Sequence, residues 1–107
     1  MPVPSLDELS LLHERVCKAV GEPRRIQILY ALDARPHNVS ELAEALGLPQ
    51  STVSRHLTIL RQSSLVVAQR SGSSITYSLA DGGIIEVLDR MRRVLRDALS
   101  RQPSLVG

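Results

Sequence analysis

The sequence predicts a mainly helical fold with one small β-hairpin, and three observations support this. Between Asn38 and Leu79, two short helical patterns meet at a glycine and are followed by two alternating runs typical of β-strands. The chain has only two aromatic residues, Tyr30 and Tyr77, so its core must be built from Leu, Ile, Val and Ala, which suits packed helices. At 107 residues, the chain supports one domain with one modest core. Helix, turn, helix, hairpin is the layout of a winged helix-turn-helix.

The first helix is expected over about residues 6–20. Ser5 and Glu8 have the spacing of a capping box at its start, and Gly21 ends it. At 100° per residue, its apolar residues fall on one stripe, which also carries His13 and Cys17. The apolar members of this stripe are Leu6, Leu9, Val16 and Val20.

Two further helices are predicted before the glycine. Pro23 suits the first turn of a helix over about residues 23–34, and Arg-Pro-His at 35–37 breaks it. Its inward-facing residues are expected to be Ile26, Leu29 and Leu32 or Tyr30. Asn38 and Glu41 form a second capping pair, which opens a short helix ending at Gly47.

The next helix, about residues 50–63, has two different sides. Val53, Leu57 and Leu60 are spaced as a buried face. The opposite face is polar and carries Gln50, Ser51, Thr52, Ser54, Arg55 and His56. Gln50 and Arg55 suit adenine or guanine edges in the major groove, and the short hydroxyl side chains suit phosphates, sugars or a thymine methyl. An ordinary amphipathic helix with a solvated face would look similar.

The predicted hairpin, residues 65–70 and 75–79, favours the DNA-binding interpretation. Its tip is Ser-Gly-Ser-Ser, and Arg70 and Ser73 lie where a wing would straddle the backbone or the minor groove. The alternative is a plain surface hairpin. However, no acidic residue occurs from Ala45 to Ala80, as expected for a surface that lies against phosphates.

A final helix is expected over about residues 83–100, and the tail from Arg101 is expected to be frayed. Its apolar residues are spaced 4-3-4-3 and are Ile84, Leu88, Met91, Leu95 and Ala98. Together, the helices at about 6–20 and 83–100 carry more apolar surface than so short a chain can bury internally. We therefore expect them to join two copies of the chain, around a DNA-reading core at residues 38–79.

Other classes of protein are disfavoured. The single cysteine, Cys17, excludes an intrachain disulfide and makes the cytoplasm the default location. The N-terminal segment lacks the features of a signal peptide, and no apolar run is long enough to span a membrane. No phosphate loop, carboxylate cluster or nucleophile with a nearby base suggests an enzyme.

The motif Q-S-T-V-S-R-H-L, within S-E-L-A-E-A-L-G-L-P-Q-S-T-V-S-R-H-L-T-I-L-R, closely resembles the ArsR/SmtB family of bacterial winged-helix repressors. E-P-R-R-I-Q-I-L before it and I-T-Y-S-L after it extend the resemblance from about Val16 to Leu99. The resemblance implies a homodimer, joined through the first and last helices, that binds an inverted-repeat operator in double-stranded DNA. It also implies an effector that releases the DNA, without identifying that effector.

The metal ligands of the family's metal sensors are mostly missing. Asn38 and Ser40 stand where arsenic and lead sensors carry cysteines. At the positions of the zinc type's ligands, Asp81 and Asp97 match the carboxylates. The two histidine positions are occupied by Gly83 and Val94. Two carboxylates without imidazoles make a poor zinc site, so no metal and no cofactor are predicted.

His13 and Cys17 are the remaining candidates for sensing. Close to a twofold axis, two copies of each would form a His₂Cys₂ set for zinc, or two Cys17 thiols could form a disulfide between subunits. We favour the simpler interpretation, in which Cys17 is a small buried apolar residue and His13 a hydrogen-bonded interface residue. A winged-helix module that binds protein instead of DNA is a further alternative.

Overall fold

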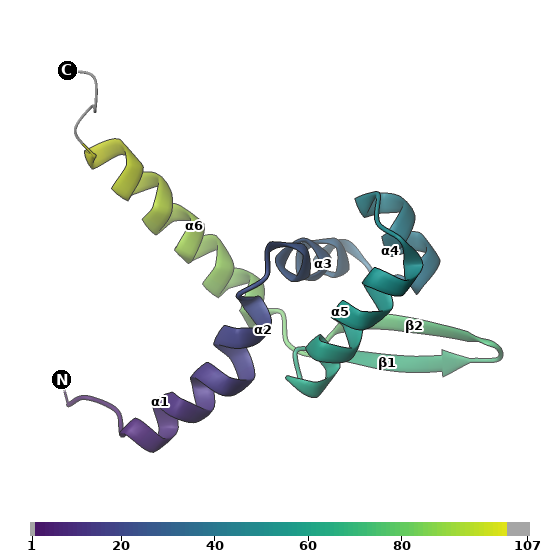
Figure 1. Cartoon of the computed structure of the whole chain (residues 1–107), viewed down its shortest axis with the longest axis horizontal. Coiled ribbons are helices and arrows are strands. Elements are labelled where there is room, and N and C mark those ends of the chain that lie inside the picture. Colours follow the sequence, from purple (N-terminus) through teal and green to yellow (C-terminus); the bar gives the residue numbers. More distant parts are fainter. Residues whose placement is uncertain (1, 103–107) are drawn as a thin grey trace.

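The computed structural model describes residues 2–102 and confirms a mainly helical fold with a two-stranded hairpin (Figure 1). The order of elements along the chain is as predicted. The elements are α1 (Leu6–Leu12), η1 (His13–Cys17), α2 (Lys18–Val20), α3 (Pro23–Ala34), α4 (Val39–Leu46), α5 (Gln50–Gln62), β1 (Val66–Ser71), β2 (Ser74–Leu79) and α6 (Gly83–Arg101).

The predicted first helix is one continuous helical run with a change of winding in its middle. Ser5 caps α1 by accepting a hydrogen bond from the Glu8 N–H at 3.2 Å. The five residues of η1 then form a π-helical segment, which leads into the single turn of α2. Neither α1 nor η1 has a buried residue, and α1 points away from the rest of the chain (Figure 1).

The start of α4 has the capping box that the sequence predicts. The Asn38 side chain accepts from the Glu41 N–H at 2.8 Å, and the Glu41 carboxylate accepts from the Asn38 N–H at 2.9 Å. That backbone hydrogen bond is the main cause that lowers the pKa of Glu41. Gly47 ends the helix at φ 66°, a left-handed conformation that glycine adopts easily.

The core lies between α3, α4, α5, the hairpin and the first turns of α6. The predicted inward residues Leu29, Leu32, Val53, Leu57 and Leu60 are all buried. Ile28 is fully buried as well, although the sequence pattern did not select it. Because α3 is surrounded by α2, α4, α5, α6 and β2, it buries a wider face than a helix with one neighbour.

The hairpin is longer than predicted and has a third, very short partner. Ser71 pairs with Ser74, so Gly72 and Ser73 alone form the turn, with Gly72 at φ 63°. His37 exchanges backbone hydrogen bonds with Tyr77 at 3.1 and 2.8 Å. His37, expected from the sequence only to help break the preceding helix, is therefore buried against β2.

The terminal helices extend away from this core. Only Ile85 and Leu88 of α6 are buried, and α6 and α1 project separately from the α3–α5 body (Figure 1). The radius of gyration is 16.6 Å, against about 13 Å for a compact chain of this length. Tyr30 ties the start of α6 to α3 by donating a hydrogen bond to Asp89 at 2.6 Å.

The last helix, α6, reaches almost to the end of the described residues. Arg101 is the last residue of α6, and the rest of the tail expected to be frayed, from 103 onward, lies outside the described residues. Across residues 2–102, no helix combines the length and apolar character that crossing a bilayer requires.

Candidate nucleic-acid interface

The exposed face of α5 is polar along its first two turns. Gln50, Ser51, Ser54 and Arg55 are exposed, and Thr52 is half-buried. The opposite face is anchored in the core by Val53, Leu57 and Leu60, which are spaced as predicted. The α5 helix is thus held firmly on one side and presents short polar side chains and a guanidinium on the other.

The N-terminus of α5 adds backbone donors to this face. Pro49 precedes the helix, and no side chain caps it. The Pro49 carbonyl accepts from the Thr52 and Val53 N–H groups, at 3.1 Å each. The N–H groups of Gln50 and Ser51, one turn earlier, have no helical acceptor, which is the arrangement that favours a phosphate.

The wing approaches the same face. A groove brings together Ser54 of α5 and Ser73 at the hairpin tip, both predicted site residues. Ser40, near the start of α4, and Ser74 also line it, and neither was predicted. Their positions follow from tertiary packing, because residues 40 and 74 have no local pattern that relates them. Arg70 is exposed on β1 beside the turn.

One predicted contact residue lies elsewhere. The His56 side chain is only 8% exposed, and its Nδ1 lies 3.3 Å from Nη1 of Arg25. The expectation that His56 shares the exposed polar face is therefore corrected. Residues 53, 56, 57 and 60 form one stripe at helical spacing, which could have indicated this burial. Burial is the main cause that lowers the pKa of His56, and the Arg25 charge adds to it.

Arg25 is a structural residue that the sequence did not reveal. Its guanidinium donates to the carbonyl oxygens of Ala19 at 2.6 Å and Lys18 at 3.1 Å, at the end of α2. The same group contacts His56 of α5. Arg25 therefore joins the end of the N-terminal helical run to the helix that carries the polar face.

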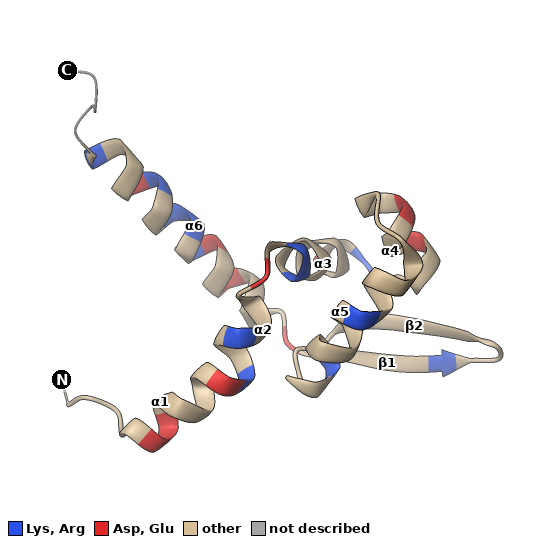
Figure 2. Ribbon diagram, in the orientation of Figure 1, with Lys and Arg blue, Asp and Glu red and all other residues tan. Residues whose placement is uncertain are grey.

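The charges are segregated between elements (Figure 2). The Asp and Glu residues lie on α1, η1, α3, α4, α6 and the connecting segments, while α5 and the hairpin carry only basic charged residues. Arg55, Arg61 and Arg70 are exposed and make no ion pair with any residue in the range 2–102. This side of the molecule is thus an acid-free surface with unneutralised arginines, as phosphate binding requires.

Comparisons with known proteins agree with this geometry. Residues 22–67 match the family model described as "Bacterial regulatory protein, arsR family". The transcriptional repressor SmtB of Mycobacterium tuberculosis is 35% identical over 99 residues, covering 92% of this chain and 73% of SmtB. The chain belongs to the arsR family.

Two other relatives extend the likeness. The M. tuberculosis regulator NmtR is 46% identical over 72 residues, which cover 67% of this chain and 60% of NmtR. The solution structure of the Mycobacterium bovis protein Mb0332, titled a homodimeric winged helix-turn-helix DNA-binding domain, is 29% identical with a TM-score of 0.75. It covers 97% of this chain and 98% of that one. The fold is that of a winged helix-turn-helix.

The positions that carry metal ligands in some arsR-family proteins have other roles here. The Asp81 carboxylate accepts at 2.8 Å from the N–H of Gly83, the first residue of α6. Asn38, at one of the two cysteine positions, caps α4. Within residues 2–102, no three His, Cys, Asp or Glu side chains cluster as a metal site.

His13 and Cys17 both lie in the π-helical segment and are both exposed in the single chain. Cys17 is therefore not a residue of the internal core, and its burial would depend on a second molecule. The nearest charged partner of His13 is Glu14, with 3.9 Å between Nδ1 and the carboxylate. Neither residue has a contact that indicates a sensing role.

Proposed function

We propose that this protein is a homodimeric transcriptional repressor that binds an inverted-repeat DNA site and is released by an effector. The observation that carries the proposal is the acid-free surface formed by α5 and the wing, with its exposed arginines. Membership of the arsR family supports the same function.

The side chains on this surface divide into two roles. Arg55 and Gln50 are long enough to contact base edges in the major groove, where guanine and adenine present matching patterns. Ser51, Thr52, Ser54 and Ser73 are suited to phosphates and sugars, which position the protein without specifying sequence. Arg70 on the wing is suited to the backbone or the adjacent minor groove.

A second copy is proposed because the apolar faces of α1 and α6 are left uncovered by residues 2–102. Exposed large apolar residues concentrate on these two helices: Leu6, Leu9, Leu11, Leu12, Val87, Met91, Val94, Leu95 and Leu99. On α6 they line an almost entirely apolar groove. Patches of this kind mark association surfaces. A twofold dimer would place two α5 helices about 34–36 Å apart, one DNA turn, and so select an inverted repeat.

The proposal is tested by selecting duplexes from a random library and measuring their binding by fluorescence anisotropy. Arg55→Ala should weaken the selected site by about 1–3 kcal/mol and relax the preference at one base pair. Arg70→Ala should weaken all duplexes alike and reduce the slope of log K against log salt. Arg101→Ala is the matched control, because Arg101 is the last residue of α6.

Three outcomes would overturn the proposal or a part of it. If no duplex binds at low salt, the winged helix serves another partner. If Arg55→Ala binds the selected site as well as the unmodified chain, α5 is not the specificity element. A selected site that contains a single half-site would contradict the dimeric arrangement.

A further inference from the structure

We propose that a pocket between η1, α2, α3 and the end of α5 binds a small organic carboxylate that acts as an effector. The pocket itself is independent of DNA binding. Its regulatory role rests on the function proposed above, and the two are tested separately.

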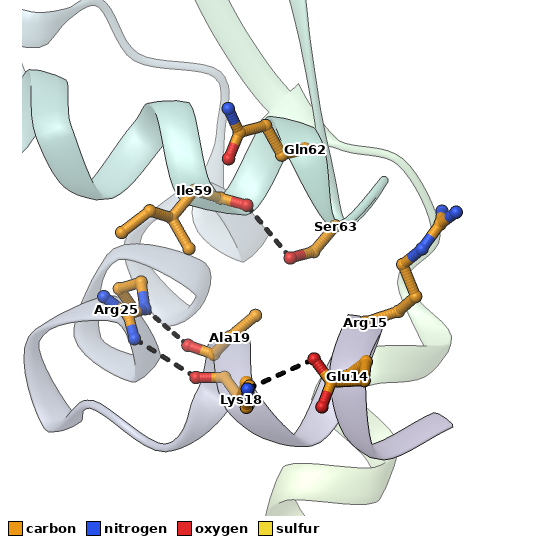
Figure 3. A pocket seen from close by; sticks show the side chains of 8 residues that line it. All are labelled: Glu14, Arg15, Lys18, Ala19, Arg25, Ile59, Gln62 and Ser63. Atoms are coloured by element: carbon orange, nitrogen blue, oxygen red, sulfur yellow. Dashed lines mark hydrogen bonds and ion pairs between the residues drawn. The ribbon is translucent and has the colours of Figure 1, made fainter. Parts of the chain in front are cut away.

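The pocket has the size of a small-molecule site, and most of the residues that line it are polar. It measures about 490 Å³, within the roughly 300–1,000 Å³ typical of ligand pockets. Figure 3 shows Lys18 and Ala19 of α2 on one side of the pocket and Gln62 and Ser63, at the end of α5, on the other. Arg25 of α3 lies between these two sides. Three separate parts of the chain thus enclose one space.

The charges of the pocket favour an anion. Arg15, Lys18 and Arg25 line it, against one acid, Glu14. Glu14 pairs with Lys18 at 3.1 Å, which leaves two unneutralised cations. Arg15 has no ion pair and no side-chain hydrogen bond with the described part of the chain. Carboxylates and phosphates are the anions whose geometry matches a guanidinium.

The remaining wall limits the ligand further. Ile59 is half-buried and Ala19 almost fully buried, and both line the pocket. Gln62 contributes an amide that makes no side-chain hydrogen bond within residues 2–102. These features suit a carboxylate attached to a small apolar body, such as an aromatic ring, rather than a bare inorganic anion.

The pocket lies beside the contact that joins the N-terminal helical run to the DNA-facing helix. Arg25 forms one wall, and its Nη1 lies 3.3 Å from Nδ1 of His56. His56 is followed in α5 by the core residue Leu57 and preceded by the exposed Arg55. An anion that draws the Arg25 guanidinium toward itself would weaken the His56 contact. Since DNA binding requires one position of α5, binding of the ligand would then lower the affinity for DNA, and binding of DNA would lower the affinity for the ligand.

Benzoate is the probe and benzamide, of the same shape but uncharged, is its control. Calorimetry on the full chain without DNA should detect benzoate and not benzamide. The variant carrying Arg15→Gln and Lys18→Gln should bind benzoate at least about ten-fold more weakly, through loss of two cations. Both positions are exposed, so this variant should fold normally. Equal binding of benzamide, or unchanged benzoate affinity in the variant, would overturn the site.

The regulatory role is tested by anisotropy with a selected duplex. Saturating benzoate should weaken DNA binding by the chain about five-fold or more. In His56→Leu, whose side chain cannot accept from the Arg25 guanidinium, benzoate should still bind while its effect on DNA is lost. If benzoate leaves the DNA affinity of the unmodified chain unchanged, the coupling is wrong.

One alternative gives a different result. If the double variant loses DNA affinity in the absence of benzoate, Arg15 and Lys18 contact phosphates and the effector site is refuted. Benzoate binding by a chain that binds no duplex would instead refute the repressor while retaining the site.

Discussion

The DNA-reading core and the terminal helices use the same residue types in opposite ways. In α5, Leu57 and Leu60 are at most 1% exposed, because α3, α4 and the hairpin enclose them. In α6, Leu95 and Leu99 are 57% and 58% exposed. Leucines of the first group stabilise one chain, whereas those of the second are more than half exposed in the part of the chain that the structure describes. The core should therefore depend on its own packing, and the terminal helices on a second molecule.

The two regions are connected by the buried Ile85 and Leu88 of α6 and by two polar links. At the start of α6, Arg92 lies over the Tyr30 ring at 5.3 Å and both Arg92 and Tyr30 contact Asp89. At the end of α2, Arg25 contacts α5 through His56. Because this second link is a polar contact rather than core packing, a change at the N-terminal helical run can alter the position of α5 without disrupting the apolar core.

The largest expected effect separates the two groups of leucines. Leu57→Ala should lower the free energy of unfolding by about 2–5 kcal/mol, because it leaves a cavity in a closed core. Leu99→Ala, the matched change on α6, should have an effect that varies with protein concentration, since its partner would be a second chain. Urea unfolding at two concentrations differing a hundred-fold measures both. A concentration-independent loss of similar size in Leu99→Ala would contradict the distinction.

A charge on α6 should break association while leaving the core folded. Leu95→Glu places a carboxylate in the apolar groove, where a dimer would bury it unpaired. We expect the dimer dissociation constant to rise about a hundred-fold or more. Size-exclusion chromatography with light scattering gives the mass, and circular dichroism checks the helix content. Arg96→Glu, also on exposed α6 but not lining the groove, is the control.

The fold could be predicted because its local signals were strong. The capping box of Asn38 and Glu41, the left-handed Gly47 and the spacing of Val53 and Leu57 each depend on residues close in sequence. The structure places each of them as expected. The family assignment is confirmed for the same reason, since its motif occupies α4 and α5.

The parts that were missed depend on contacts between distant residues. His56 was placed on the polar face because histidine is polar, whereas its burial is made tolerable by Arg25, 31 residues away. The groove that joins Ser40 to Ser73 arises only when the wing folds against α4 and α5. The π-helical winding at His13–Cys17 has no sequence signal that we can identify.

The contact between Arg25 and His56 should make the free energy of unfolding depend on pH. Burial first, then the charge of Arg25, lowers the pKa of His56, with Arg55 adding and Glu22 opposing. The folded chain thus keeps His56 neutral down to a lower pH than the unfolded chain, which takes up a proton below the ordinary pKa of 6.5. Because the unfolded state then binds more protons, the free energy of unfolding should fall as pH drops below about 6.5. Urea titrations from pH 8 to pH 5 measure this.

His56→Gln is the control for the pH dependence. It keeps a polar side chain beside Arg25 and removes the proton-binding group, so its stability profile should be flatter between pH 7 and pH 5. A profile as steep as that of the unmodified chain would mean that another group is responsible.

The smallest expected effect concerns the residues that end α4 and α5. One helix ends at a glycine and the other at a serine, both with positive φ. After α4, Gly47 adopts φ 66°, and after α5, Ser64 adopts φ 63°. Ser64 donates its N–H to the Arg61 carbonyl at 2.9 Å, and Leu65 donates to Leu60 at 3.0 Å, which is the Schellman arrangement. A side chain in this conformation costs about 1–2 kcal/mol. Glycine avoids this cost, but part of the gain is offset because glycine loses more conformational entropy on folding.

Ser64→Gly should therefore raise the free energy of unfolding by about 0.5–1 kcal/mol. Gly47→Ser should lower it by a similar amount, since no atom lies within 4 Å of the added Cβ and backbone strain is the main cost. Thermal unfolding of both variants should show shifts of opposite sign. A destabilised Ser64→Gly would mean that the Ser64 side chain makes a contact, in the dimer or with DNA, that outweighs the backbone strain.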